Sequence, residues 1–149
     1  MSRREHFGVG LIARDRAATR FYLQQKDAAY RRYPLAYSLF GGAIERGETA
    51  EDGLARELVE ELGRSAAWLL AAPPRWVGEY RVGPRRFRFG LFDAIVDDAV
   101  LDVLAKAPVF EGERGAVVGR AELASLPFVW GLEVVVLDYL ARIDSAGTG

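Results

Sequence analysis

Three glutamates that lie close together in the sequence, Glu57, Glu60 and Glu61, have the types and spacing to do metal chemistry. Spacings of three and four residues place them on one side of a helix, where three like charges repel one another. A divalent cation would turn that repulsion into attraction and would also neutralise the oxygens of a phosphate ester. Taken alone, the three residues are better explained as a solvated acidic helix face, since charge runs are common on surfaces.

Composition restricts the other kinds of site. The chain has 149 residues, no cysteine and one histidine, His6. Thiolate nucleophiles and Cys-based zinc or iron–sulfur sites are therefore excluded, as are a Ser/His/Asp triad and a multi-histidine metal site. Carboxylates remain as the main metal ligands, and oxygen-only sites suit hard cations such as Mg²⁺, Mn²⁺ or Ca²⁺. The formal net charge of −1 indicates no general polyanion-binding surface, so we expect no nucleic-acid partner.

The length fits one domain over residues 1–149, large enough to bury a core without disulfides. No run of 18 apolar residues occurs, and the first residues lack the apolar region and small-residue cleavage site of a signal peptide. We therefore expect a cytoplasmic protein with no membrane partner. Residues 144–149 are expected to form a loose polar tail.

The glutamates lie within a predicted helix over residues 50–62. Thr49 is a good N-cap, Asp52 completes a capping-box pattern, and Gly63 is well placed to end the helix. The glutamates occupy one arc at about 100° per residue. A broad apolar arc on the other side would anchor the helix, and it is made up of Leu54, Ala55, Leu58, Val59 and Leu62.

Strand patterns surround this helix. Short apolar runs predict strands over residues 7–13, 21–25, 36–40, 75–82, 86–96, 109–111 and 116–118. The first two are expected to pair, the third to end at Gly41-Gly42, and 75–82 with 86–96 to form a hairpin around Gly83-Pro84. Further helices are predicted over 121–125 and 128–143. Because helices and strands interleave, the fold class is expected to be α/β (α+β), with helices covering a mixed sheet.

Residues 42–64 resemble the Nudix box, the signature of the Nudix hydrolase family (MutT-like). The positions that match the box are Gly42, Glu48, Arg56, Glu57, Leu58, Glu60, Glu61 and Gly63, and the commonly accompanying Gly41 and Glu45 are present too. Seven identity-specified positions, each with a background frequency of roughly 7%, coincide by chance about once in 10⁸ starting points. Two positions depart from the pattern. Arg64 replaces an aliphatic residue, and Phe40 stands where many members have proline, although neither is a metal ligand in the family.

The resemblance implies an α/β/α sandwich and a reaction class. Members typically hydrolyse a phosphoanhydride in a nucleoside diphosphate linked to another moiety, with Mg²⁺ or Mn²⁺ as cofactor. A non-standard or oxidised nucleoside triphosphate is one candidate substrate. A dinucleoside polyphosphate hydrolase and a non-catalytic, nucleotide-binding regulatory module on the same fold stay open as alternatives. Since many relatives dimerise, a homodimer is open as well.

The resemblance also implies roles for the residues of the box. Glu60 and Glu61 would ligate the metal, and Glu57 would be a ligand or the general base. Gly41 would offer its backbone carbonyl to the metal, while Gly42 and Gly63 would have structural roles. Arg56 would pair with Glu48 to orient the catalytic helix, and a plain surface ion pair is the alternative.

Candidates outside the box come from the hairpin and the loop after it. Glu111 is expected to supply a further carboxylate as metal ligand or base, with Glu113 in reserve, although both could be exposed loop residues. Alternation would place Arg86 and Arg88 on one sheet face, where they would bind phosphate or, alternatively, protect a solvated edge strand. Tyr80 lies where some members that cleave diadenosine polyphosphates carry a tyrosine. Aromatic residues that are candidates to stack on a base, or to belong to the core, are Tyr30, Tyr33, Phe87 and Phe89.

Overall fold

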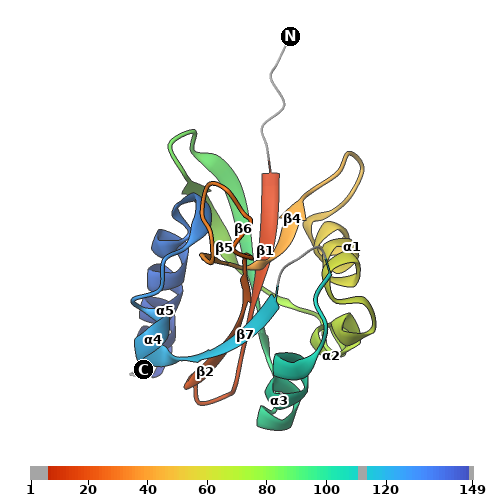
Figure 1. Ribbon diagram of the computed structural model, residues 1–149, viewed down its shortest axis with the longest axis vertical. Coiled ribbons are helices and arrows are strands. Elements are labelled where there is room, and N and C mark those ends of the chain that lie inside the picture. The colour runs from red at the N-terminus through yellow and green to blue at the C-terminus, as the bar shows by residue number, and fades with distance from the viewer. Residues whose placement is uncertain (1–6, 111–113, 148–149) are drawn as a thin grey trace.

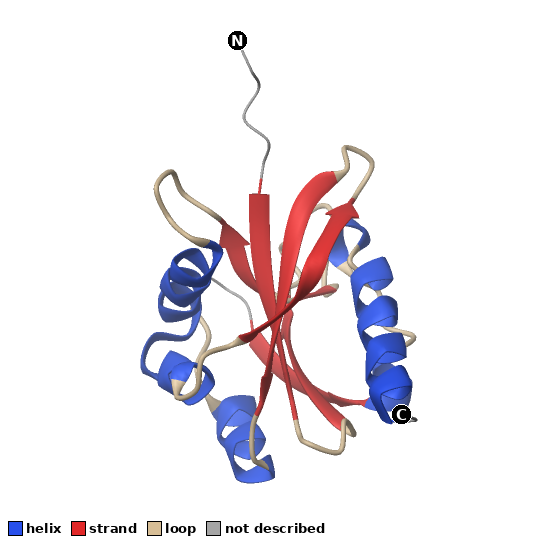
Figure 2. Cartoon of the chain, turned by 180° about the vertical axis from the view of Figure 1, so that it is seen from behind, coloured by secondary structure: helices blue, strands red, loops and turns tan. Residues whose placement is uncertain are grey.

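The computed structural model describes residues 7–110 and 114–147, and within them a mixed seven-stranded β-sheet lies between two layers of helices (Figures 1 and 2). The predicted α/β/α sandwich is therefore confirmed. The strands are β1 (Phe7–Arg14), β2 (Arg20–Gln25), β3 (Tyr37–Ser38), β4 (Phe40–Ala43), β5 (Arg75–Val82), β6 (Phe87–Ile95) and β7 (Arg114–Gly119). The α-helices are α1 (Ala50–Leu62), α2 (Ala66–Leu70), α3 (Asp98–Lys106), α4 (Arg120–Leu123) and α5 (Glu133–Gly147).

Strand β1 organises the sheet, whose order is β3-β2-β1-β6-β5. It pairs in parallel with β6 along its whole length, from Phe7 opposite Arg88 to Arg14 opposite Ile95. Its other edge is shared, because β4 pairs with Gly8–Leu11 and β2 pairs with Ala13–Arg14. Along this edge, β1 therefore pairs first with β4 and then, nearer its C-terminal end, with β2.

Alternating side chains of the sheet supply two apolar cores. Val9, Leu11 and Ala13 of β1 pack with Leu54, Leu58 and Leu62 in the core under α1, whereas Ile12 packs with residues of α5 in the other core. Figure 1 shows α1, α2 and α3 on one side of the sheet and α4 and α5 on the other. This arrangement follows from the period of two in a strand, which sends neighbouring residues to opposite faces.

Helix α1 begins and ends as predicted. The Asp52 N–H donates to Thr49 Oγ1 at 3.1 Å, and Gly63 ends the helix with a φ of 56°. The expected division into an apolar and an acidic face is wrong at two residues. Val59 is 54% exposed, and Glu61 is buried because it lies at the edge of the apolar arc and finds hydrogen-bond donors on the sheet.

Strands differ from the prediction near the double glycine and around the hairpin. The segment 36–40 is divided at Leu39 into β3 and β4, and β4 continues through Gly41-Gly42 instead of ending there. The glycines permit this pairing because a Cβ on Gly41 would lie 2.0 Å from the Val9 carbonyl oxygen. Residue Arg86 lies in the turn before β6 with a φ of 52°. It therefore does not alternate with Arg88, and the prediction that the two share a sheet face is wrong.

The later part of the chain also departs from the prediction. Val109 and Phe110 are not in a strand, and residue 111 lies outside the described residues. The final helix begins at Glu133, since Trp130 has a left-handed φ of 58° in the 3₁₀ turn Val129–Gly131. It then runs to residue 147, so residues 144–147 are helical and not a loose tail. Helices α2 and α3 were not predicted.

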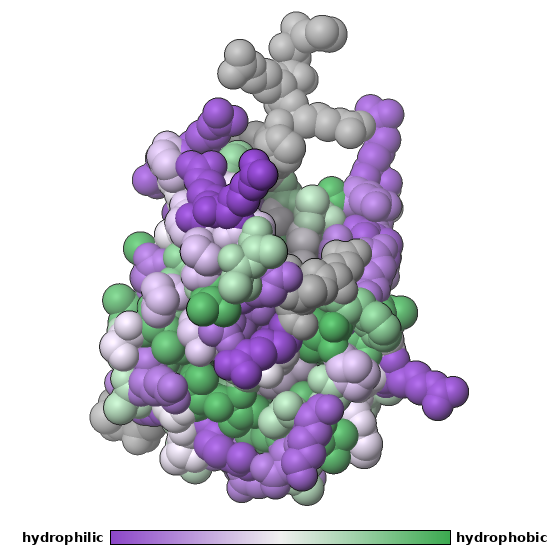
Figure 3. Space-filling view, in the orientation of Figure 1, coloured by the Kyte–Doolittle hydropathy of each residue, from purple (hydrophilic) through white to green (hydrophobic). Residues whose placement is uncertain are grey.

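On the face in Figure 3, hydrophilic and hydrophobic side chains are intermixed. None of the helices in the described residues is both long enough and apolar enough to cross a membrane.

Candidate active site

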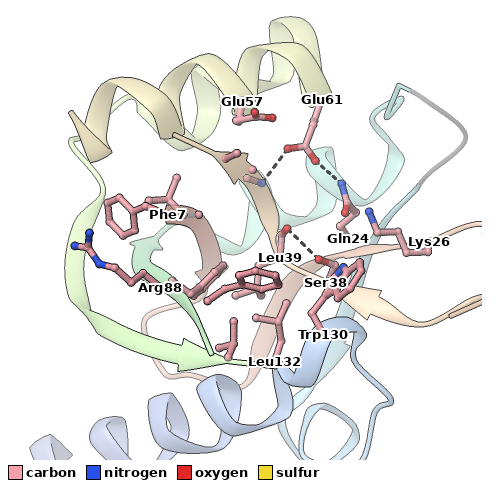
Figure 4. Close-up of a pocket in the computed structure, with 18 of the residues that line it drawn as sticks. Phe7, Gln24, Lys26, Ser38, Leu39, Glu57, Glu61, Arg88, Trp130 and Leu132 are labelled. Carbon is pink, nitrogen blue, oxygen red and sulfur yellow. Dashed lines mark hydrogen bonds between the residues drawn. The ribbon is translucent and has the colours of Figure 1, made fainter. Parts of the chain in front are cut away.

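A cavity of about 680 Å³ lies at the end of the sheet where β1 and β6 begin and β2 and β5 end. Glu57, Glu60 and Glu61 of α1 all line it, together with Gly41 and Gly42 of β4. Figure 4 shows Glu57 and Glu61 reaching into the cavity from α1, with Gln24 and Lys26 at one side and Phe7 and Arg88 at the other. The structure thus brings the three glutamates of the box to one cavity wall.

The carboxylate of Glu57 lies directly against the backbone of Gly42. A Cβ on Gly42 would lie 2.5 Å from Cδ of Glu57, so only glycine leaves room for this carboxylate. Burial raises the pKa of Glu57, and a hydrogen bond from Arg56 opposes that shift in part. A carboxylate with a raised pKa is a stronger proton acceptor than an exposed one.

Arg56 connects the glutamates of the box. Its Nε donates to Glu48 Oε2 at 2.8 Å, and its Nη2 donates to Glu48 Oε1 and to the Ala43 carbonyl at 3.0 Å each. Its Nη1 donates to Glu57 Oε1 at 3.1 Å and to Glu60 Oε1 at 3.2 Å. The hydrogen bond from Arg56 also lowers the pKa of Glu48. The predicted contact between Arg56 and Glu48 is therefore present, and it fixes the guanidinium beside the carboxylates of Glu57 and Glu60.

Glu61 is held by two neutral donors from the sheet. The Gly41 N–H donates to Glu61 Oε1 at 2.9 Å, and Nε2 of Gln24 donates to Glu61 Oε2. Gln24 is 2% exposed and lines the cavity, and it was not among the predicted site residues. The sequence signal for Gln24 was its polar side chain in the predicted strand FYLQQ, directly after three apolar residues of that strand. Burying an amide is costly unless it is hydrogen-bonded, so Gln24 is ordered together with Glu61.

Tyr22, two residues before Gln24 on the same face of β2, adds a buried hydroxyl near this site. It has no hydrogen-bond partner among the described residues. Burial raises the pKa of Tyr22, and the negative charge of Glu61 raises it further. Tyr22 is therefore a neutral phenol that contributes no charge to the site.

The residues present suit a hard divalent cation by their chemistry. Among the described residues no three acidic or histidine side chains are gathered into a ready metal cluster. Glu57 and Glu60 nevertheless both lie within hydrogen-bond distance of one positively charged atom, Arg56 Nη1. Carboxylate oxygens are the ligands that Mg²⁺ or Mn²⁺ prefers, so Glu57, Glu60 and Glu61 are the described residues that could hold such a cation.

Of the two arginines predicted to bind phosphate, one lines the cavity. Arg88 does so, with Nη2 2.8 Å from Glu79 Oε1 and its guanidinium over the ring of Phe7. The neighbouring Arg85 lines it too, whereas Arg86 is not among the described lining residues.

Tyr80 was expected near the substrate but packs elsewhere. Its hydroxyl donates to Asp138 of α5, and it is not among the described residues that line the cavity. Its position gives no support to the dinucleoside polyphosphate alternative.

The remaining acidic candidates, Glu111 and Glu113, lie outside the described residues. The residue before them is placed, because the Phe110 N–H donates to the Glu61 carbonyl at 3.1 Å. The chain thus passes the C-terminal end of α1 immediately before Glu111.

Across the cavity from the glutamates lies an aromatic wall that sequence reasoning found only in part. Phe87 and Phe89 line the cavity, while Tyr30 and Tyr33 pack beside the core and are not among its described lining residues. Trp130 lines it as well and was missed, since a tryptophan in a predicted helix gives no sign of a left-handed backbone.

Comparisons with known proteins identify a family model and solved structures with a similar fold. A family model described as NUDIX domain matches residues 4–117. No curated protein matches the sequence. A MutT/Nudix family protein from Listeria innocua is similar in structure, with a TM-score of 0.71, 16% identity and coverage of 99% of each chain.

Two further solved structures have the same fold. One comes from a structure and function analysis of MutT from Aliivibrio salmonicida and Vibrio cholerae, with a TM-score of 0.68, 19% identity and coverage of 93% of this chain and 99% of that chain. The other is a MutT protein from Methanosarcina mazei Go1, with a TM-score of 0.65, 18% identity and coverage of 100% of this chain and 99% of that chain.

Proposed function

The chain belongs to the Nudix domain family, and from this premise we propose that it hydrolyses a phosphoanhydride bond in a nucleoside diphosphate linked to another moiety, with Mg²⁺ or Mn²⁺ as cofactor. A non-standard or oxidised nucleoside triphosphate is one candidate substrate. The observation that carries the proposal is the convergence of Glu57, Glu60 and Glu61 on one cavity wall, with Arg56 bonded to two of them. An ordinary acidic helix face would be solvated, whereas Glu61 is buried and hydrogen-bonded.

Residues of α1 and β4 would hold the metal. We assign this role to Glu60 and Glu61 with the Gly41 carbonyl, since the backbone of Gly41 already contacts Glu61 through its N–H. A bound cation neutralises diphosphate oxygens and lowers the pKa of a bound water. Hydrogen bonds from Gln24 and Gly41 keep Glu61 directed toward this side of the cavity.

Glu57 is the residue best placed to accept a proton. Burial raises its pKa, which makes the carboxylate more basic, and the hydrogen bond from Arg56 opposes part of that shift. Removing the carboxylate as Glu57→Gln is expected to lower the turnover number by about 10²- to 10⁴-fold.

Other charged residues would complete the site. Arg88, which lies beside Phe7 at the side of the cavity away from Gln24 and Lys26, is suited to bind phosphate oxygens through its guanidinium. Glu111 would supply a further carboxylate, since the hydrogen bond between the Phe110 N–H and the Glu61 carbonyl brings the chain to the end of α1 just before it.

The test is turnover of a nucleotide panel by the purified protein with Mg²⁺ or Mn²⁺, followed by chromatography. The panel contains ordinary and oxidised nucleoside triphosphates, nucleoside diphosphate sugars and dinucleoside polyphosphates. Glu60→Gln and Glu61→Gln are expected to lose turnover while remaining folded. Glu51→Gln is the matched control, since Glu51 lies on the exposed first turn of the same helix.

Two results would overturn the proposal. Full activity of both Glu60→Gln and Glu61→Gln would show that α1 does not carry the chemistry. Binding of nucleotides by the wild-type protein without turnover of any panel member would instead identify a non-catalytic nucleotide-binding module.

A further inference from the structure

The hydroxyl of Tyr22 is buried without a hydrogen bond. Tyr22 is 1% exposed, and among the described residues its oxygen is the one buried side-chain nitrogen or oxygen that has no partner. Burying a hydroxyl group without a hydrogen bond is unfavourable, so a phenylalanine at this position would give a more stable fold. A buried polar group that the fold retains despite this cost calls for a functional explanation.

The aromatic ring of Tyr22 is explained by packing alone. It stacks on the ring of Phe40, with 5.0 Å between the ring centres and 17° between the ring planes. It also belongs to the apolar core under α1, which includes Leu58 and Leu62 of that helix. A phenylalanine would keep these contacts, so the hydroxyl is the part of the side chain that packing does not require.

The position of the hydroxyl follows from the pairing of β2 with β7. A Cβ on Gly115 of β7 would lie 2.5 Å from the Tyr22 hydroxyl oxygen, and Gly115 is paired with Gln24 in the sheet. Residues 22 and 24 share one face of β2, so the phenol extends along this face to the level of Gln24. The hydroxyl therefore lies beside the residue whose Nε2 donates to Glu61 Oε2, a contact drawn in Figure 4.

A hydroxyl in this place can orient a carboxylate. Its O–H rotates to suit an acceptor, and an ionised carboxylate has several acceptor sites. Carboxylates that ligate a metal are themselves oriented by hydrogen bonds from neighbouring groups, and these neighbours affect metal affinity. Gln24 is already bonded to Glu61 in this way, as is the Gly41 N–H.

We propose that Tyr22 is a positioning residue of the metal site, whose hydroxyl donates to the Gln24–Glu61 pair when Glu61 ligates a cation. Ligation uses lone pairs of the carboxylate and shifts its oxygens, so a donor beside the pair gains an acceptor. The stability lost by burying the hydroxyl is then recovered as affinity for the cation. This inference rests on the proposed function, because it concerns the cation site of that reaction.

The variant Tyr22→Phe tests the role of the hydroxyl, because it keeps the ring. Calorimetry with Mn²⁺ measures cation affinity, and thermal unfolding in EDTA measures the stability of the fold on its own. We expect Mn²⁺ affinity to fall about 10- to 100-fold, the range for groups that orient metal ligands. The melting temperature in EDTA should equal or exceed that of wild type, since the variant removes a hydroxyl without a partner among the described residues.

Tyr139 provides the matched control, since it is similarly buried but its hydroxyl is paired. It is 2% exposed, accepts from Arg14 Nε and donates to Asp93 Oδ2, at 2.8 Å each. Neither Tyr139 nor these two partners are among the described residues that line the cavity. Tyr139→Phe should therefore lower the melting temperature and leave Mn²⁺ affinity unchanged, the reverse of the result for Tyr22→Phe.

A double variant tests whether Tyr22 acts through the Gln24–Glu61 pair. Tyr22→Phe and Gln24→Met each remove one donor beside Glu61, so their effects on Mn²⁺ affinity should be coupled. The loss in Tyr22→Phe/Gln24→Met is expected to be smaller than the product of the two single losses. A loss equal to that product would mean that the hydroxyl does not act through this pair.

The outcomes separate this inference from the proposed function. Wild-type Mn²⁺ affinity in Tyr22→Phe, or a lower melting temperature of this variant in EDTA, would overturn the role of Tyr22 alone. A wild-type protein that binds Mn²⁺ but hydrolyses no nucleotide would overturn the proposed function, and the affinities would still decide the role of Tyr22. A wild-type protein that binds no Mn²⁺ would overturn both.

Discussion

The carboxylate of Glu57 occupies the space that a side chain at Gly42 would need, with 2.5 Å between Glu57 Cδ and the Cβ position of Gly42. The first glycine of the box motif is therefore explained by contact with a glutamate of the helix that follows it. Gly42 and Glu57 bring strand β4 and helix α1 together at the cavity, and the backbone of Gly42 sets the position of the Glu57 carboxylate.

Replacing Gly42 with alanine should displace Glu57. The added methyl group cannot coexist with the carboxylate, so the side chain must rotate away from its place in the cavity. A shift of about 1 Å at a reacting group costs on the order of 100-fold, and we expect a loss of that size in kcat/KM. Gly119→Ala is the control, because the nearest atom to its Cβ position is 4.0 Å away. Wild-type kinetics in Gly42→Ala would contradict the assignment.

Replacing Arg56 with lysine should lower activity although the charge is kept. A lysine has one nitrogen and cannot bond Glu48, Glu57 and the Ala43 carbonyl together as the guanidinium does. Loss of such outer contacts costs about 10- to 100-fold in metal affinity or activity, and calorimetry with Mn²⁺ and steady-state kinetics would measure it. Arg46→Lys, at an exposed position, should behave as wild type. Unchanged metal affinity and kcat in Arg56→Lys would show that the contacts are incidental.

Replacing Gln24 with methionine should destabilise the protein. Methionine has a similar shape but no N–H, so Glu61 Oε2 keeps its burial and loses a donor. A buried acceptor left without its partner costs about 1–3 kcal/mol, which urea unfolding would detect. Lys106→Met, at an exposed position, is the control for adding a methionine. A free energy of unfolding equal to that of wild type would mean that water replaces Gln24 as the donor.

Asp15 should give the protein a pH-dependent part of its stability. Burial would raise the pKa of Asp15, but hydrogen bonds from the Thr19 hydroxyl and from the N–H groups of Thr19 and Arg20 outweigh it and lower the pKa below 3.8. A carboxyl whose pKa is lower in the folded state stabilises the fold above its unfolded pKa and loses that contribution as pH falls through the folded value.

The matching variant is Asp15→Asn. It should be less stable than wild type at pH 7, and the difference should shrink as the pH falls below about 4. Thermal unfolding at several pH values measures both curves. A difference that stays constant across this range would assign the effect of Asp15 to shape and not to charge.

The box helix could be predicted because its signals are local. Thr49, Asp52 and Gly63 mark its ends within the segment itself, and the structure places both ends there. Helix α3 carried comparable signals that were not used. Asp97 and Asp98 stand at its start, and Leu101 and Leu104 are buried at a spacing of three.

Other features depend on contacts between distant segments. The burial of Glu61 requires Gln24, which lies on a different strand, and nothing near residue 61 in the sequence indicates that partner. The left-handed turn at Trp130 lies beside Gly83, which is distant in the sequence, so the surroundings of this turn are set by tertiary packing. Such contacts leave no periodic signal in the sequence, which explains why the aromatic side of the cavity was found only in part.

The parallel pairing of β1 with β6 has a consequence for how the protein folds. Phe7 pairs with Arg88 in the sheet, so this part of the cavity forms only when the first strand meets a strand from the second half of the chain. Pairings between residues far apart in sequence form slowly, because loop-closure entropy is lost before the contacts repay it. During synthesis, β1, β4 and α1 leave the ribosome well before β6, and they carry the glutamates but not the opposite wall. The three glutamates are therefore made early, and the cavity that they line closes late.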